Sequence, residues 1–148
     1  MCEVGSKYKK STTVTGYKVV VKVRGRYYSP FTGYQYHIGT LPHMKYERNS
    51  SKFIHYNDLV LVPYMSYHTD KMYKKTGVLL DPNRVNTLYT SVNKVCRGRE
   101  DTNIKAAILR MTISGDLHRA KYGSDKTMIG SHIDDFEEIT LEQCTKIN

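Results

Sequence analysis

Two stretches of the chain show the clearest alternation of apolar and polar side chains. Residues 16–24 contain a run of valines that alternates with Lys22 and Arg24, and Gly25 follows at the position of a tight turn. Residues 104–113 repeat the pattern, with alternate apolar side chains on one side and Gly115 beyond the end. A two-residue period rich in β-branched side chains is typical of a half-buried strand. Both stretches are therefore predicted as strands.

Shorter extended segments surround these two. Residues 27–33 and 34–39 are rich in tyrosine and predict, with the first strand, a small antiparallel meander. Residues 57–63 form an apolar run closed by proline, which is typical of a buried strand. Residues 117–127 resemble a loop, and residues 127–139 suggest a final strand with acidic side chains at its exposed positions.

One short helix is expected near the middle of the chain. Thr90 or Ser91 can cap its start, Val92, Val95 and Cys96 fall on one face, and Gly98 can end it. Residues 64–87 contain tyrosines, lysines and turn formers, including an Asp-Pro-Asn sequence, and predict little regular structure.

These elements predict an α+β fold, mainly an antiparallel sheet with one or two short helices. There is no strand-helix-strand alternation long enough for a parallel sheet. Residues 1–15 are polar and are expected to form a flexible basic arm, and residues 16–148 a single α+β domain.

The charge is unevenly distributed along the chain. Residues 1–130 hold 22 Lys and Arg against 9 Asp and Glu, whereas residues 131–148 hold one Lys against five acids. A basic body attracts nucleotides, nucleic acid or acidic protein surfaces, and such affinity falls with added salt. The alternative is a surface whose charge serves solubility.

The composition also excludes several classes of protein. Cys2, Cys96 and Cys144 are widely spaced and form no CxxC pair, so reduced thiols are expected. Six histidines are scattered without metal-binding spacing, and no phosphate loop or dinucleotide fingerprint is present, so neither metal nor cofactor is expected. No apolar run could span a membrane and the first residues lack a signal-peptide core, which predicts a soluble cytoplasmic protein. The sequence leaves the oligomeric state open.

Tyrosine and arginine supply the candidate binding chemistry. The chain has 13 tyrosines and no tryptophan. A cation beside an aromatic ring can neutralise a phosphate while the ring stacks on a base. The candidate ligand-binding residues are Arg24, Arg26, Tyr27, Tyr28, Lys74, Lys75, Arg97 and Arg99. The alternative is that about half of the tyrosines pack in a sheet with their hydroxyls in water.

Two patterns bear on catalysis. Ser91 and Lys94 have the Ser-x-x-Lys spacing of penicillin-recognising enzymes, but the accompanying elements are missing and a helix cap is the better explanation of Ser91. A carboxylate pair for acid/base work could come from Asp134, Asp135, Glu137, Glu138 and Glu142, yet a run of acids on an exposed strand and tail is usually a solvated face. The sequence therefore favours a non-catalytic protein.

Several short sequence motifs give the chain a family resemblance. They are Gly16-Tyr17-Lys18-Val19-Val20, Arg26-Tyr27-Tyr28-Ser29-Pro30, Leu88-Tyr89-Thr90-Ser91 and Ile129-Gly130-Ser131-His132-Ile133. In these the chain resembles a loose group of small uncharacterised proteins encoded mainly by bacteriophages and large DNA viruses. The resemblance implies a viral accessory protein in the host cytoplasm, which acts by binding a nucleotide signal or a host defence protein.

A second resemblance concerns the order of polar residues. An early arginine, Thr90-Ser91 on a strand and a late Glu138 or Glu142 resemble the Arg, Ser-Thr-Ser and Glu order of ADP-ribosyltransferases. Tyr89 stands where the first serine would be, and there is no Glu-x-Glu or Gln-x-Glu.

The sequence suggests three functions that can be tested. The first is a viral accessory protein that binds a nucleotide-type ligand or nucleic acid through a basic, tyrosine-rich face. The second is an inhibitor that docks on a host defence enzyme. The third is a divergent enzyme of the ADP-ribosyltransferase type.

Overall fold

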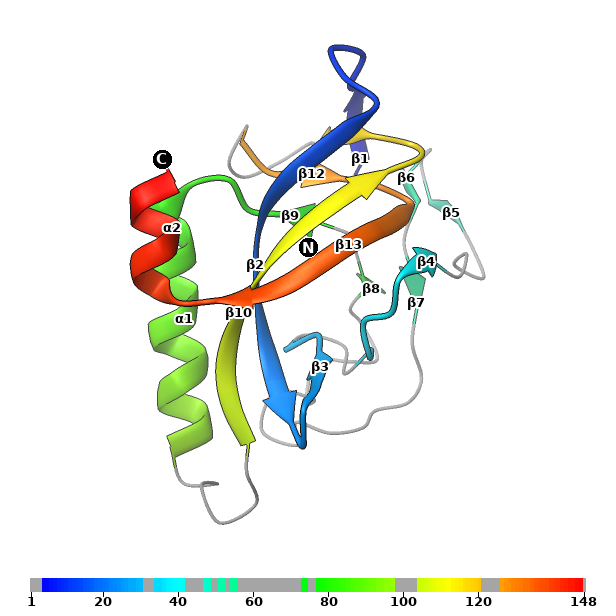
Figure 1. The fold of residues 1–148 in the computed structure, drawn as a ribbon. Helices are drawn as coiled ribbons and strands as arrows, with labels where there is room; N and C mark the ends of the chain where they lie inside the picture. The colour runs from blue at the N-terminus through cyan, green and yellow to red at the C-terminus, as the bar shows by residue number, and fades with distance from the viewer. Residues whose placement is uncertain are drawn as a thin grey trace.

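The computed structural model describes residues 4–30, 34–41, 47–48, 51–52, 54–55, 73–74, 77–97, 104–120 and 126–147. In these residues the protein has an α+β fold in which antiparallel strands predominate, as predicted from the sequence (Figure 1). The strands are β1 (Val4–Lys7), β2 (Thr13–Val23), β3 (Arg26–Tyr28), β4 (Gly39–Thr40), β5 (Glu47–Arg48), β6 (Ser51–Lys52), β7 (Ile54–His55), β8 (Tyr73–Lys74), β9 (Gly77–Val78), β10 (Ile104–Ser114), β11 (His118–Ala120), β12 (Met128–Ile129) and β13 (His132–Ile139). The helices are α1 (Pro82–Cys96) and α2 (Leu141–Ile147).

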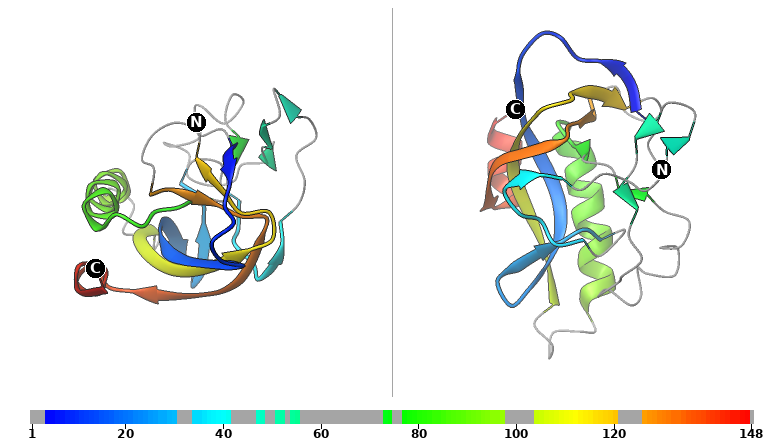
Figure 2. Two further views of the ribbon diagram at one scale, coloured as in Figure 1. Left: turned by 90° about the horizontal axis from the view of Figure 1, so that it is seen from above. Right: turned by 90° about the vertical axis from the view of Figure 1, so that its right-hand side faces the viewer.

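Two main sheets form the framework. The larger has the order β3-β2-β10-β13-β4, and the smaller has the order β1-β11-β12-β9. The pairs β5-β6 and β7-β8 stand apart from both sheets. Seen from above, the larger sheet curves, with α1 beside one end and the smaller sheet over its inner side (Figure 2).

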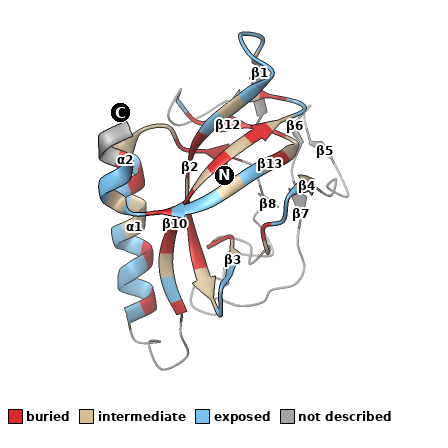
Figure 3. Cartoon of the chain, in the orientation of Figure 1, coloured by how far each residue is buried: buried red, intermediate tan, exposed pale blue. Residues whose placement is uncertain are grey.

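The central strands β2 and β10 are buried on both faces. Val19 and Val21 pack with α1, whereas Val20 faces a second cluster that includes residues of the smaller sheet. Val20 and Val21 are each 0% exposed. Figure 3 shows buried stretches along both β2 and β10. The strand predicted from the alternation in residues 16–24 is therefore more buried than expected: Val19, Val20 and Val21 are buried, and Lys18, Lys22 and Val23 are half-buried.

The two sheets join at a close crossing. Tyr17 of β2 and Leu79, which follows β9, donate backbone hydrogen bonds to each other's carbonyls at 2.7 and 2.6 Å. A side chain at Gly16 would collide with Val78 and Leu80, so this approach requires glycine. The larger sheet thus continues into the smaller one along the edge of β2.

Helix α1 begins earlier than the sequence predicted. Asp81 is its N-cap, and the Asp81 carboxylate accepts a hydrogen bond from the Asn83 amide at 3.0 Å. The predicted caps, Thr90 and Ser91, lie inside the helix and donate their hydroxyls to backbone carbonyls four residues back. The prediction was wrong because Asp81 followed by proline at the first helical position is a strong helix start, not only a turn.

Helix α2 was not predicted. Thr140 and Gln143 form a capping box, in which the Thr140 amide donates to Gln143 Oε1 at 2.8 Å and the Gln143 amide donates to Thr140 Oγ1 at 3.3 Å. Cys96 on α1 and Cys144 on α2 are both buried, and neither belongs to a disulfide.

Several strand predictions need correction. Residues 34–39 form no strand of a meander: they make one bridge, Tyr28 to Gln35, and β4 then pairs with β13. Residues 117–127 include β11, and the predicted final strand is two strands, β12 and β13, in different sheets. Gly130 and Ser131 separate these two, and the Ser131 amide bonds to the Ser114 carbonyl at 3.1 Å.

The predicted N-terminal arm contains paired residues. Val4–Lys7 forms β1 against β11, and Thr13 to Thr15 belong to β2, which therefore starts three residues before Gly16. The predicted strand over residues 57–63 lies outside the described residues.

Candidate anion-binding site at the β2–β3 hairpin

A two-residue turn joins β2 to β3 at one end of the molecule. Val23 pairs with Arg26, and the connecting Arg24 and Gly25 have φ of 52° and 78°. Positive φ at both central positions matches the turn that follows the natural twist of a hairpin. The turn exposes Arg24, and the strand that follows exposes Arg26.

A hollow of about 410 Å³ opens beside this hairpin. Its lining residues are Val23, Arg24, Arg26, Tyr28 and Ile104. Ile104, Val23 and Arg26 are successive register partners on β10, β2 and β3, so the hollow spans three neighbouring strands, about 10 Å. Its floor is apolar and its edge carries two guanidinium groups beside a half-buried tyrosine.

Tyr27 faces the other side of the hairpin. Its hydroxyl donates to Glu138 Oε1 at 2.8 Å, and Lys22 Nζ reaches the same oxygen at 2.7 Å. The Tyr27 ring also lies edge-on to Phe136, with centroids 5.9 Å apart. The Glu138 carboxylate therefore ties β2 and β3 to β13 from the face opposite the hollow.

The electrostatics of this cluster favour its charged form. Burial raises the pKa of Glu138, but hydrogen bonds from Lys22 and Tyr27 and the charges of Lys22 and Lys105 outweigh it, so the pKa lies below its ordinary value. The hydrogen bond to Glu138 raises the pKa of Lys22, and burial followed by the same carboxylate raises the pKa of Tyr27. Glu138 is thus a paired carboxylate.

The structure places the other candidate residues unequally. Arg97 is exposed at the C-terminal end of α1, the end that leads toward the start of β10 (Figure 1). Lys74 belongs to β8 and pairs with Ile54 away from the hairpin, while Lys75 and Arg99 lie outside the described residues. Of the eight predicted residues, the structure brings Arg24, Arg26 and Tyr28 into one hollow.

Sequence reasoning missed the floor of the hollow. Val23 and Ile104 were predicted as strand residues, but the sequence of either strand contains no signal that the two residues pair. The cation Lys105, next to Ile104, and its register partner Lys22 were missed for the same reason.

The residues considered for catalysis are not assembled. Thr90 and Ser91 lie on α1, against one face of the larger sheet, while Glu138 points to the opposite face with Lys22 and Tyr27. The strand that the resemblance to ADP-ribosyltransferases needs at Thr90-Ser91 is therefore a helix on the other side of the sheet. Ser91 of the Ser-x-x-Lys pattern donates its hydroxyl to the Thr87 carbonyl within α1 at 3.0 Å.

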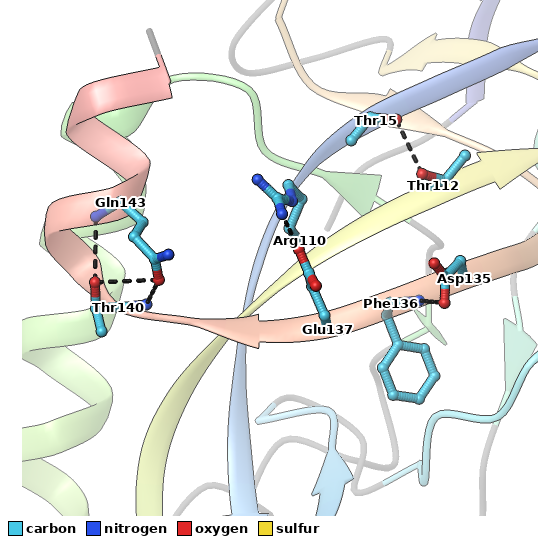
Figure 4. A network of polar contacts seen from close by, with 8 residues as sticks. All are labelled: Thr15, Arg110, Thr112, Asp135, Phe136, Glu137, Thr140 and Gln143. Carbon is cyan, nitrogen blue, oxygen red and sulfur yellow. Dashed lines mark hydrogen bonds and ion pairs between the residues drawn. The ribbon is translucent and has the colours of Figure 1, made fainter.

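The acidic residues of β13 have structural partners. Glu137 forms an ion pair with Arg110, and Asp135 accepts from the Phe136 amide at 2.9 Å (Figure 4). Asp134 accepts from the Ser114 hydroxyl at 2.9 Å and lies 3.5 Å from His132 Nε2. These contacts describe a solvated sheet face in which each carboxylate has a neighbouring donor.

Two further features bear on the class of site. Within the described residues, no group of three or more His, Cys, Asp and Glu side chains could hold a metal ion. Neither described helix combines the length and apolar character that crossing a membrane requires.

No family model, curated protein or solved structure matches this chain. The resemblance to bacteriophage and viral proteins accordingly stays a prediction. A proposal for the function must be based on the hairpin and its hollow.

Proposed function

We propose that the protein is a non-catalytic binding module that takes a nucleotide-type phosphate ligand in the hollow beside the β2–β3 hairpin. The observation that carries this proposal is the convergence of Arg24, Arg26 and Tyr28 over an apolar floor. A viral accessory role is part of the proposal and depends on the family resemblance of residues 16–20 and 26–30.

The chemistry of the lining suits such a ligand. A guanidinium group offers a planar fork of donors that matches phosphate oxygens, and two of them stand at the edge of the hollow. A tyrosine ring can stack on a base, and the floor of Val23 and Ile104 can cover the apolar side of a sugar or base. The hollow also falls in the size range of small-molecule sites, roughly 300–1,000 Å³.

Binding without catalysis is the better account of the neighbouring groups. The carboxylate nearest to the hairpin in the described structure, Glu138, faces away from the hollow and is held by Lys22 and Tyr27. A general acid or base must reach the reacting group, which this geometry does not allow from the opposite face of a sheet.

The first test is a melting-temperature panel with nucleoside monophosphates and diphosphates, cyclic nucleotides and NAD, at low and physiological salt. A ligand at 100 times its dissociation constant adds about 2.7 kcal/mol of stability, which gives a clear shift in a domain of this size. A selective shift names the ligand class.

Variants then locate the site. Arg26→Ala removes one phosphate partner, worth about 1.5–3 kcal/mol for a hydrogen bond to a charged group, and should weaken binding roughly tenfold or more. Arg84→Ala is the matched control, because Arg84 is an exposed arginine near the opposite end of α1. Equal affinity of the Arg26 variant and the control would place the ligand elsewhere. A flat panel with every ligand would reject the proposal and favour docking on a host protein.

A further inference from the structure

Exposed cations continue beyond the hollow along the end of α1. Lys94 and Arg97 are exposed there, flanking Cys96, which shares a buried cluster with Ile104 on the floor. Lys105, the register partner of Lys22, belongs to the opposite face of the sheet. Figure 1 shows that the end of α1, the start of β10 and the hairpin all lie at the same end of the molecule.

The charge of this end exceeds what a mononucleotide needs. Four exposed cations stand on the side of the hollow and α1 among the described residues: Arg24, Arg26, Lys94 and Arg97. Lys22 and Lys105 are on the opposite face, where Lys22 pairs with Glu138. Arg24 and Arg26 line the hollow, so one bound phosphate group would leave Lys94 and Arg97 facing solvent.

We propose that the ligand is single-stranded nucleic acid. One base occupies the hollow against Tyr28, Arg24 and Arg26 hold its phosphate, and the adjoining phosphates follow the surface toward Lys94 and Arg97 at the end of α1. This inference rests on the proposed function, since the hollow must first accept one nucleotide.

A single strand suits the site better than a duplex. Backbone-tracking cations combined with an aromatic platform are the usual means of binding an unpaired strand. In a duplex the bases are stacked inside and would not reach Tyr28, whose ring is half-buried beside Val23. The floor of the hollow would then contribute nothing.

The experiment compares ligands by length. Fluorescence anisotropy measures binding of labelled oligonucleotides of one, two, four and eight residues, a duplex of the same sequence and inorganic polyphosphate, each over a series of salt concentrations. We expect affinity to rise at least tenfold from the mononucleotide to the tetramer. The logarithm of the binding constant should fall with the logarithm of salt concentration, with a slope of about −0.7 for each phosphate contacted.

Two variants separate the parts of the site. The double variant Lys94→Ala, Arg97→Ala should weaken the octamer, reduce the slope by about 1.4 and leave mononucleotide affinity unchanged. Tyr28→Leu should weaken every nucleotide ligand but not polyphosphate, while Tyr28→Phe keeps the ring and the binding. Arg84→Ala again serves as the control.

The outcomes distinguish the two proposals. If mononucleotide and octamer bind equally through Arg26, the hollow binds a small ligand and the strand proposal is wrong. Tighter binding of the duplex, or of polyphosphate regardless of Tyr28, would also overturn it. If no nucleotide of any length depends on Arg26, both proposals fail.

Discussion

Arg24 has a backbone conformation that arginine rarely adopts. Its φ of 52° lies in the left-handed region, next to Gly25 at 78°. Turns of this type favour asparagine or glycine at the first central position, and a longer side chain such as arginine loses roughly 1–2 kcal/mol there. The presence of Arg24 at the edge of the hollow therefore lowers the local stability of the turn.

Arg24→Asn should for this reason have opposite effects on folding and on binding. We expect the free energy of unfolding to rise by about 1 kcal/mol, because asparagine fits the turn, and nucleotide affinity to fall, because the guanidinium group is lost. Urea unfolding and ligand titration of the same preparation measure both. A variant that is less stable than the wild type would contradict the role of the turn.

Glu138 should make stability depend on pH. Its pKa in the folded protein is below the ordinary value of 4.5, so the ionised carboxylate stabilises the fold above that pH, and the contribution is lost as pH falls through the folded-state pKa. At 38% exposure the ion pair is worth about 0.5–1 kcal/mol, which Glu138→Gln should remove at neutral pH and not in strong acid. Urea unfolding over a pH series checks this. Lys22→Met should act through the same pair, so the two changes should not be additive.

Among the elements, the helices show which local signals matter. Asp81 with Pro82, and Thr140 with Gln143, are capping sequences that could have been recognised without a structure. The long strands β2 and β10 were predicted correctly because eleven residues are enough to show a period of two. Strands of two or three residues, such as β9, β11 and β12, are too short to show any period, and their pairing depends on the rest of the molecule.

Asp81→Ala tests the start of α1. Loss of the cap should lower the free energy of unfolding by about 1 kcal/mol. Thr90→Ala is the matched control: Thr90 is an exposed interior position of α1, where alanine is the better helix former, so we expect no loss. Comparable destabilisation by the two changes would mean that α1 begins near Thr90 after all.

For the whole molecule, the limit of prediction lies in long-range register. Arg24 to Tyr28 could be proposed as a site because they are neighbours in sequence. Val23 and Ile104 could not be added to it, because the alternation within a strand says which side chains share a face but not which strand lies alongside. For the same reason, the crossing of β9 over β2 at Gly16 could not be predicted from the sequence.

Gly16→Ala tests that crossing. The new methyl group would meet Val78 and Leu80, and overpacking of this kind costs about 1–3 kcal/mol. Gly77→Ala is a suitable control, since a Cβ atom there lies 3.5 Å from Thr127 and 3.8 Å from Met128, which are ordinary contacts. Calorimetric melting of both variants should show a lower transition temperature for Gly16→Ala alone.

The burial of β2 on both faces also determines how the protein unfolds. Val21 belongs to the cluster under α1 and Val20 to the cluster under the smaller sheet, so neither layer can detach without exposing a side of the strand they share. The two layers should consequently lose their structure in one step. Amide protons in the centre of β2 should exchange with solvent at the rate set by global unfolding, while those at the Arg24-Gly25 turn exchange through local opening. The hairpin could then rearrange around a ligand without disturbing the strand that carries it.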